Sequence, residues 1–155
     1  MKERILNFEG MDMLALKVAK ILENGGILGL IGDLGTGKTT FTKRICSYLG
    51  ITENIKSPTF TYVIEYTSGK RTVYHFDAYR IMRPEEIYET GFEDYIGEEG
   101  SVVIVEWADN IIEELPEDAV YVEIKYDNEN TRKVSLYKFK NGEKDYVDFC
   151  NNNNN

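Results

Sequence analysis

Apolar residues at two different spacings predict the elements of the first fifty residues. Residues 4–8, with apolar Ile5, Leu6 and Phe8, predict a short leading strand. Helical spacing follows, with Asp12 as the expected N-cap and the glycines at 25 and 26 as the expected end. The apolar side of this predicted helix carries Leu14, Val18, Ile21 and Leu22.

A strand, a glycine-rich segment and a second helix are predicted to follow one another directly. Residues 27–31 form an apolar run, and the segment after them carries glycine at 32, 35 and 37. Helical spacing then resumes at Phe41, Ile45, Tyr48 and Leu49. Gly50 is the expected residue just past the end of this helix, because glycine tolerates the left-handed conformation found there.

Strands joined by turns dominate the second half of the chain. Residues 61–67 and 71–77 flank a Ser68-Gly69 turn and predict a hairpin. Residues 102–105 are all apolar, which is typical of a strand buried on both faces. Residues 120–126 and 133–139 predict a second hairpin.

Short helices and loops connect these strands. Pro84 fits the first turn of a helix over residues 85–90, and acidic residues 92–100 are predicted to form a loop. Another short helix is expected to end at Pro116. The sequence contains no internal repeat or interdomain linker, so residues 1–142 are predicted to form one domain and residues 143–155, with their Asn-rich end, a disordered tail.

The glycine-rich segment matches a phosphate-binding motif. Gly32-Asp33-Leu34-Gly35-Thr36-Gly37-Lys38-Thr39 fits G-x-x-x-x-G-K-[ST], and it lies between a predicted strand and a predicted helix, as the motif requires. Glycines let successive backbone N–H groups face a polyphosphate, and the positive end of the helix adds to the attraction. Asp33 to Thr40 are therefore the predicted nucleotide-binding residues, with Lys38 on the β- and γ-phosphates and Thr39 on Mg²⁺.

Composition and charge narrow the function classes. The chain has 155 residues, 42% of them hydrophobic, and no apolar run long enough to span a membrane. Acids outnumber bases 27 to 18, for a net charge of −9, which disfavours strong direct binding to nucleic acid. The N-terminus lacks an apolar signal segment, and two cysteines make no disulfide framework, so a cytoplasmic location is expected.

Two acidic residues are candidates for holding the metal. A P-loop enzyme needs a carboxylate at the end of a buried strand, to hold Mg²⁺ and help orient the attacking group. Glu106 and Asp77 both end predicted strands, and strand ends converge in open α/β sheets. Both are assigned catalytic and metal-binding roles, and the choice of direct ligand between them stays open. The ordinary alternatives are a solvated strand end for Glu106 and a turn residue for Asp77.

Three further residues lie close to these acids in the sequence. His75 is predicted to share a strand face with Asp77, and a structural imidazole explains it as well as a catalytic one. Trp107 follows Glu106, with core filling as the alternative role. Arg80 is expected to form a salt bridge, with a charge that stabilises the hydrolysis reaction as the alternative role. Asp94-Tyr95-Ile96-Gly97 matches the D-x-x-G of GTPases without a preceding strand, and no N-K-x-D segment occurs, so adenine is the expected base.

Four blocks together resemble the TsaE (YjeE) ATPases of bacterial tRNA threonylcarbamoyladenosine synthesis. They cover residues 10–126 in order and spacing, and the first alone is generic. The blocks are Gly32 to Thr40, Ser57-Pro58-Thr59-Phe60, His75-Phe76-Asp77-Ala78-Tyr79-Arg80 and Val105-Glu106-Trp107. Thr36 departs from the Ala or Ser that the family often has, and the chain after about Gly142 matches nothing in the family pattern.

The resemblance implies an α/β fold of the P-loop NTPase type, with three layers and a mixed sheet of parallel core strands and antiparallel hairpins. It implies an ATPase that is weak alone, uses ATP and Mg²⁺, and supports a transferase made of TsaD and TsaB. This complex modifies the tRNA at position 37, next to the anticodon, and tRNA would contact this chain only indirectly. By the family pattern, Ser57 to Phe60 form a switch-like loop, and His75, Tyr79, Arg80 and Trp107 are functional.

Two other function classes stay open on the residues alone. A small-molecule kinase has a similar size and the same phosphate-binding motif, although such kinases usually carry a mobile, Arg-bearing lid and no such insertion is evident. A regulatory nucleotide sensor would need binding without turnover. The effect of a partner on hydrolysis distinguishes these classes.

Overall fold

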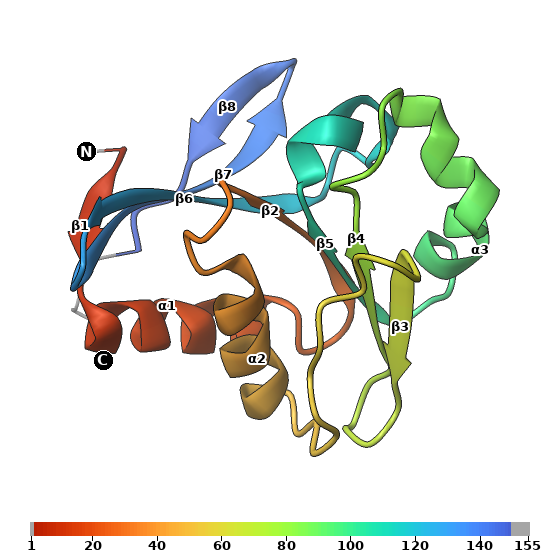
Figure 1. Ribbon diagram of the computed structural model, residues 1–155, viewed down its shortest axis with the longest axis horizontal. Coiled ribbons are helices and arrows are strands. Elements are labelled where there is room, and N and C mark those ends of the chain that lie inside the picture. The colour runs from red at the N-terminus through yellow and green to blue at the C-terminus, as the bar shows by residue number, and fades with distance from the viewer. Residues whose placement is uncertain (1, 150–155) are drawn as a thin grey trace.

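An eight-stranded mixed sheet organises residues 2–149, which are the residues described by the structure, a computed structural model (Figure 1). The strand order is β1-β7-β6-β2-β5-β4-β3, and β8 pairs with β7. The bounds are β1 Arg4–Leu6, β2 Gly26–Ile31, β3 Val63–Tyr66, β4 Val73–Asp77, β5 Val102–Glu106, β6 Val120–Asn128, β7 Thr131–Lys140 and β8 Glu143–Tyr146.

The centre of the sheet is parallel and its flanks are antiparallel. Strand β2 pairs in parallel with β5 and β6, and β5 pairs in parallel with β4. The hairpins β3–β4 and β6–β7 are antiparallel. These pairings confirm the predicted α/β class with parallel core strands, and they confirm both predicted hairpins.

Helices cover both faces of the sheet (Figure 1). Helices α1 (Phe8–Ile21) and α2 (Lys38–Tyr48) lie on one face. The 3₁₀ helices η1 (Pro84–Thr90) and η2 (Ala108–Glu114) and helix α3 (Phe92–Ile96) lie on the other. Each face has its own hydrophobic core, because successive side chains of a strand point to opposite faces. All five residues of β5 are buried, as its apolar sequence predicts.

The register of the parallel strands brings two acids to one edge of the sheet. Asp77, the last residue of β4, lies opposite Glu106, the last residue of β5. Glu106 in turn lies opposite Leu30 of β2, whose chain continues after Ile31 into the glycine-rich segment. The predicted convergence of the strand-end acids beside this segment is confirmed.

Helix α1 begins earlier than predicted. Its N-cap is Asn7 and not Asp12: the Asn7 side-chain oxygen accepts a hydrogen bond from the Gly10 N–H at 2.8 Å. Asp12 lies inside the helix, where its carboxylate accepts a bond from the Tyr48 hydroxyl at 2.6 Å. Asparagine caps helices as well as aspartate does. The strand predicted over residues 4–8 is shorter than expected: β1 ends at Leu6, which leaves Asn7 to cap α1.

Two further predictions are wrong. Residues 92–96 form helix α3 and not a loop: Gly91, with φ 81°, redirects the chain, and the buried Phe92 ring packs against Phe76 at 5.1 Å between centroids. Order also extends past residue 142, since Glu143–Tyr146 form β8 on β7. The Asn-rich end, residues 151–155, lies outside the described residues. Over residues 2–149, every helix is too short or too polar to cross a bilayer.

Candidate functional site

The glycine-rich segment forms an open loop between β2 and α2. Gly35 and Gly37 have φ values of 83° and 108°, a conformation that side-chain-bearing residues rarely adopt. A Cβ atom at either position would meet no atom within 4 Å, so this face of the loop is free to receive a ligand. Gly32 is different, because a Cβ there would lie 2.4 Å from the Ile124 carbonyl oxygen. Glycine at 32 therefore permits close packing, whereas glycines at 35 and 37 shape the backbone.

Helix α2 begins at this loop without a side-chain cap. Its N-cap residue is Gly37, which makes no side-chain hydrogen bond to the helix. The first N–H groups of a helix have no partner within the helix, and the helix dipole gives that end a partial positive charge. The loop and the first turn of α2 together offer the donor array that suits a phosphate.

Lys38 lies folded over the loop that precedes it. Its ammonium donates to the Gly32 carbonyl oxygen and, at 2.9 Å, to that of Asp33. The ammonium also lies 4.2 Å from the centroid of the Trp107 ring. Burial lowers the pKa of the Lys38 ammonium, and the nearby carboxylates of Glu106, Asp109, Asp77 and Asp33 act in the opposite direction. The cation is thus held at the loop by oxygens and an aromatic face.

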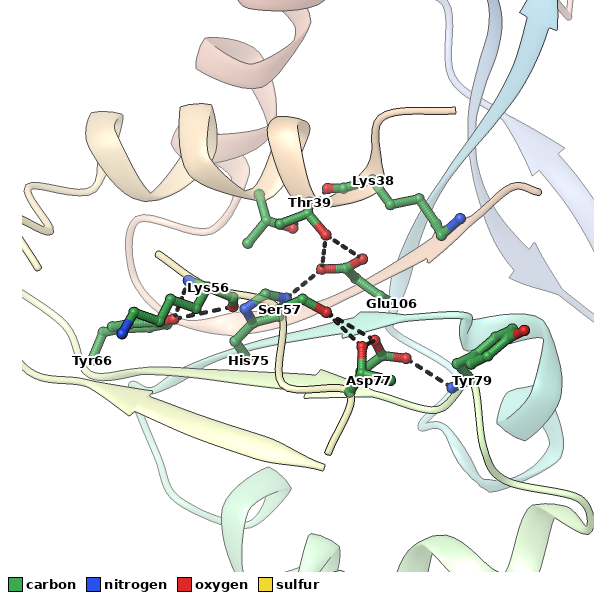
Figure 2. A network of polar contacts seen from close by, with 11 residues as sticks. Lys38, Thr39, Lys56, Ser57, Tyr66, His75, Asp77, Tyr79 and Glu106 are labelled. Atoms are coloured by element: carbon green, nitrogen blue, oxygen red, sulfur yellow. Dashed lines mark hydrogen bonds and ion pairs between the residues drawn. The ribbon is translucent and has the colours of Figure 1, made fainter. Parts of the chain in front are cut away.

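Glu106 connects the sheet to the first turn of α2 (Figure 2). The Thr39 hydroxyl lies 2.9 Å from Glu106 Oε1 and 3.0 Å from Oε2, close enough to donate to either. His75 Nε2 lies 2.6 Å from Glu106 Oε2. Glu106 is only 3% exposed, so it is not a solvated strand end. A hydroxyl at the end of the glycine loop and a strand-end carboxylate are the pair with which P-loop enzymes hold Mg²⁺.

Asp77 contacts a different segment (Figure 2). Its Oδ2 atom accepts bonds from the Thr59 hydroxyl at 2.9 Å and the Ser57 hydroxyl at 3.3 Å, which are 2.7 Å from each other. Its Oδ1 atom accepts from the Tyr79 N–H at 2.8 Å. Asp77 is buried and makes no contact with the glycine loop among the hydrogen bonds of residues 2–149. The two acids therefore have different partners.

A cavity of about 360 Å³ joins these groups. Most of the predicted site residues line it: Leu34, Gly35, Gly37, Lys38, Thr39, Thr40, Ser57, Thr59, Asp77, Tyr79, Glu106 and Trp107. Trp107 has φ 59°, an unusual conformation for a tryptophan, and its ring lies 4.9 Å from the Tyr79 ring. Trp107 therefore serves as wall of the cavity as well as packing into the core beside it.

Several predicted residues lie outside the cavity wall. Asp33 contributes its carbonyl oxygen to Lys38 and to the Thr36 hydroxyl. Pro58 accepts two backbone bonds that close the 57–62 loop. Phe60 is 87% exposed. Arg80 forms no ion pair within residues 2–149, contrary to prediction; its guanidinium lies 5.4 Å from the Tyr62 ring and 3.5 Å from the Thr59 carbonyl oxygen.

A second cavity, of about 500 Å³, lies on the other side of the glycine loop. It shares Gly37 and Thr40 with the first, and its other walls include Phe8, Arg44 and Arg132. The Arg44 guanidinium lies 3.9 Å from the Phe8 ring centroid and donates to the Phe8 carbonyl oxygen at 2.9 Å. Arg132 donates to the Thr36 carbonyl oxygen at 3.0 Å. Nothing in the spacing of these residues indicates that they meet.

The donor set around Thr39 fits a hard divalent cation. The Thr39 hydroxyl and the carboxylates of Glu106 and Asp77 supply oxygen only, which is the ligand type that Mg²⁺ prefers. Residues 2–149 contain no cluster of three or more His, Cys, Asp or Glu side chains that could hold a metal ion. Mg²⁺ commonly binds through one or two protein oxygens together with substrate phosphates, and the Thr39 hydroxyl and the Glu106 carboxylate are two such oxygen donors.

Comparison with known proteins gives one consistent family. Residues 6–134 match the family model described as "Threonylcarbamoyl adenosine biosynthesis protein TsaE". The chain is 39% identical to the tRNA threonylcarbamoyladenosine biosynthesis protein TsaE of Bacillus subtilis, over 88% of this chain and 84% of that one. It is 38% identical to the protein of that name from Haemophilus influenzae, over 77% and 78%.

Structural comparison agrees. The crystal structure of Bacillus subtilis YdiB matches with a TM-score of 0.69 and 35% identity, covering 87% of this chain and 84% of that one. The sequence match spans the glycine loop, the Ser57 to Phe60 segment and both strand-end acids. The resemblance seen in four short blocks is therefore confirmed over most of the chain. The chain belongs to the TsaE family of tRNA threonylcarbamoyladenosine biosynthesis proteins.

Proposed function

We propose that this chain is a Mg²⁺-dependent ATPase of the P-loop type. It would work in the cytoplasm and support a threonylcarbamoyl transferase made of TsaD-like and TsaB-like subunits, acting on tRNA position 37. The observation that most directly supports this proposal is the contact between Thr39 and Glu106. It lies at the N-terminus of α2, which has no side-chain cap, and close to the Lys38 ammonium. These are the parts that bind and polarise a triphosphate in P-loop enzymes.

The residues that line the cavity would each have a separate role in ATP hydrolysis. The backbone N–H groups of the glycine loop and the first turn of α2 would hold the β-phosphate, and Lys38 would turn from its carbonyl partners to the β- and γ-phosphates. Bound Mg²⁺ would neutralise charge on the phosphate oxygens. Thr39 and Glu106 would hold that ion, because they already form a pair. Asp77, with the Ser57 and Thr59 hydroxyls, would orient the attacking water.

The second cavity is the proposed site of the base. It is continuous with the loop through Gly37 and Thr40, so a nucleotide whose phosphates lie on the loop can extend into it. Phe8 is 72% exposed there, and an exposed aromatic ring is a surface on which a purine can stack. The Arg44 guanidinium next to that ring holds it in place.

Phe8→Ala tests the base site. Stacking of a base on an aromatic ring is worth about 1–3 kcal/mol, so we expect the dissociation constant for ATP to rise about 5- to 150-fold. Calorimetry with inorganic triphosphate, which has no base, should show no change. Met13→Ala is the matched control, because Met13 is an exposed apolar residue of the same helix and does not line the cavity. Equal losses for ATP and triphosphate would contradict the assignment.

Partner dependence tests the proposed function as a whole. Phosphate release would be measured for the chain alone and with the TsaD-like and TsaB-like proteins of the same cell. We expect the pair to raise the rate at least about tenfold, a change of about 1.4 kcal/mol in the activation barrier. An unchanged rate with intact ATP binding would favour a nucleotide sensor. Phosphate transfer to a small molecule instead of water would favour a kinase.

A further inference from the structure

His75, the single histidine of the chain, lies at the middle of strand β4, between β5 and the edge strand β3, and is 0% exposed. Its backbone pairs in register with Ile104 of β5, two residues before Glu106. Its side chain lies on the same face as Val73, which belongs to the hydrophobic core beneath α1 and α2. An apolar side chain would therefore suit this position for packing alone.

A buried imidazole needs a compensating contact, because burying a polar group without a hydrogen bond is costly. The contact that His75 makes is the one between its Nε2 atom and Glu106 Oε2, at 2.6 Å. An ionised carboxylate only accepts hydrogen bonds, so Nε2 carries the proton and donates it. The Nδ1 atom has no hydrogen-bond partner in residues 2–149, so the bond to Glu106 is the one hydrogen bond of this side chain there, and its ring lies 6.4 Å from the Tyr66 ring.

Glu106 is consequently held between two donors. The Thr39 hydroxyl approaches it from the helix and His75 from the sheet (Figure 2). Without His75, the end of the Glu106 side chain could rotate about its last bonds, and the oxygens would no longer both face Thr39. The Thr39 hydroxyl has one hydrogen and two lone pairs, and donating the hydrogen to Glu106 directs its lone pairs away from Glu106.

We infer that His75 is a positioning residue, which orients Glu106 so that Glu106 and Thr39 together present oxygen atoms to a divalent cation. This inference rests on the proposed function, because it assigns a role toward the Mg²⁺ of the nucleotide complex. Groups that hold a metal ligand in place are typically worth 10- to 100-fold in metal affinity. His75 itself does not contact the metal or the nucleotide.

Two amide substitutions of different length test the positioning role of His75. In His75→Gln the side-chain amide reaches the place of Nε2 and can still donate to Glu106, whereas in His75→Asn it is one methylene short. Binding of Mn²⁺ to the complex with ADP would be measured by electron paramagnetic resonance, and metal-free ADP binding by calorimetry in EDTA. We expect His75→Asn to raise the Mn²⁺ dissociation constant about 10- to 100-fold and His75→Gln to stay within about threefold of the original protein. Metal-free ADP affinity should change in neither variant.

Phe76→Leu serves as the control for stability. Phe76 neighbours His75 on β4 but points to the other face, against Phe92, so this change should lower the melting temperature and leave Mn²⁺ affinity unaltered. Equal Mn²⁺ affinity in His75→Asn and the original protein, or equal loss in the Asn and Gln variants, would overturn the inference. If the original protein bound no Mn²⁺ with ADP, the proposed function itself would fail.

Discussion

Replacing Lys38 with alanine should lower kcat/KM for ATP by at least about 100-fold, the loss typical of removing one charge-stabilising donor from a transition state. Lys38 is the only lysine among the residues that line the cavity beside the glycine loop. Its ammonium now binds the carbonyl oxygens of Gly32 and Asp33, and these bonds would be exchanged for phosphate oxygens when a nucleotide binds. Calorimetry should also show weaker binding of ATP with and without Mg²⁺, since the lysine acts on the phosphates directly.

Two controls separate the charge from its surroundings. Lys43 lies on the same helix and is exposed, so Lys43→Ala should leave turnover unchanged. Lys38→Met keeps most of the apolar stem of the side chain and removes the ammonium, which lies over the Trp107 ring. The methionine variant should therefore be as inactive as the alanine variant. Full hydrolysis in either Lys38 variant would refute the placement of the triphosphate on this loop.

Strands β4 and β5 could be predicted from the sequence because residues buried on both faces of a sheet are mostly apolar. Residues 102–105 of β5 are apolar on both faces, and β4 places His75 and Phe76 on opposite faces. Parallel strand ends meet at one edge, so the meeting of Asp77 and Glu106 follows from the assignment of the two strands. The glycine loop is determined locally, since its backbone conformation requires glycine at 35 and 37.

Contacts between distant segments could not be predicted in this way. The second cavity combines Phe8, Arg44 and Arg132, which come from three separate elements. Periodicity places each residue on a face of its own element and carries no information about which faces meet. The division of partners between Glu106 and Asp77 is of the same kind, because it depends on where the 57–62 loop crosses the end of β4.

Local sequence signals were also insufficient where the same residues fit both a helix and a loop. Acidic residues 93 and 94 favour the first turn of a helix, whereas the glycines at 97 and 100 favour a loop. Burial of Phe92 against Phe76 favours the helix over the loop. This burial is a tertiary contact, so the local sequence does not reveal it. Three of the four residues of strand β8 are charged and three are exposed, so pairing with β7 rather than hydrophobicity defines it.

Glu106→Gln should lower kcat/KM by on the order of 100-fold at physiological Mg²⁺, with a different binding profile from the Lys38 variants. The amide of glutamine has one accepting oxygen, whereas Thr39 and His75 both donate toward Glu106. Thr39 would lose one of the two oxygens that it now contacts, and the metal would lose a negative ligand. Metal-free ATP should bind equally well or more tightly, because a negative charge near the triphosphate is removed.

Titration of activity against Mg²⁺ provides the measurement, since the variant should need a higher metal concentration for half-maximal rate. Glu98→Gln is the matched control: both Glu98 oxygens lie 2.9 Å from the Tyr74 hydroxyl, much as those of Glu106 lie near Thr39, but Glu98 does not line the cavity. That variant should keep the original Mg²⁺ dependence. An unaltered Mg²⁺ requirement in Glu106→Gln would contradict the assignment of Glu106 as metal ligand. The assignment would then pass to Asp77, the other carboxylate that lines the cavity.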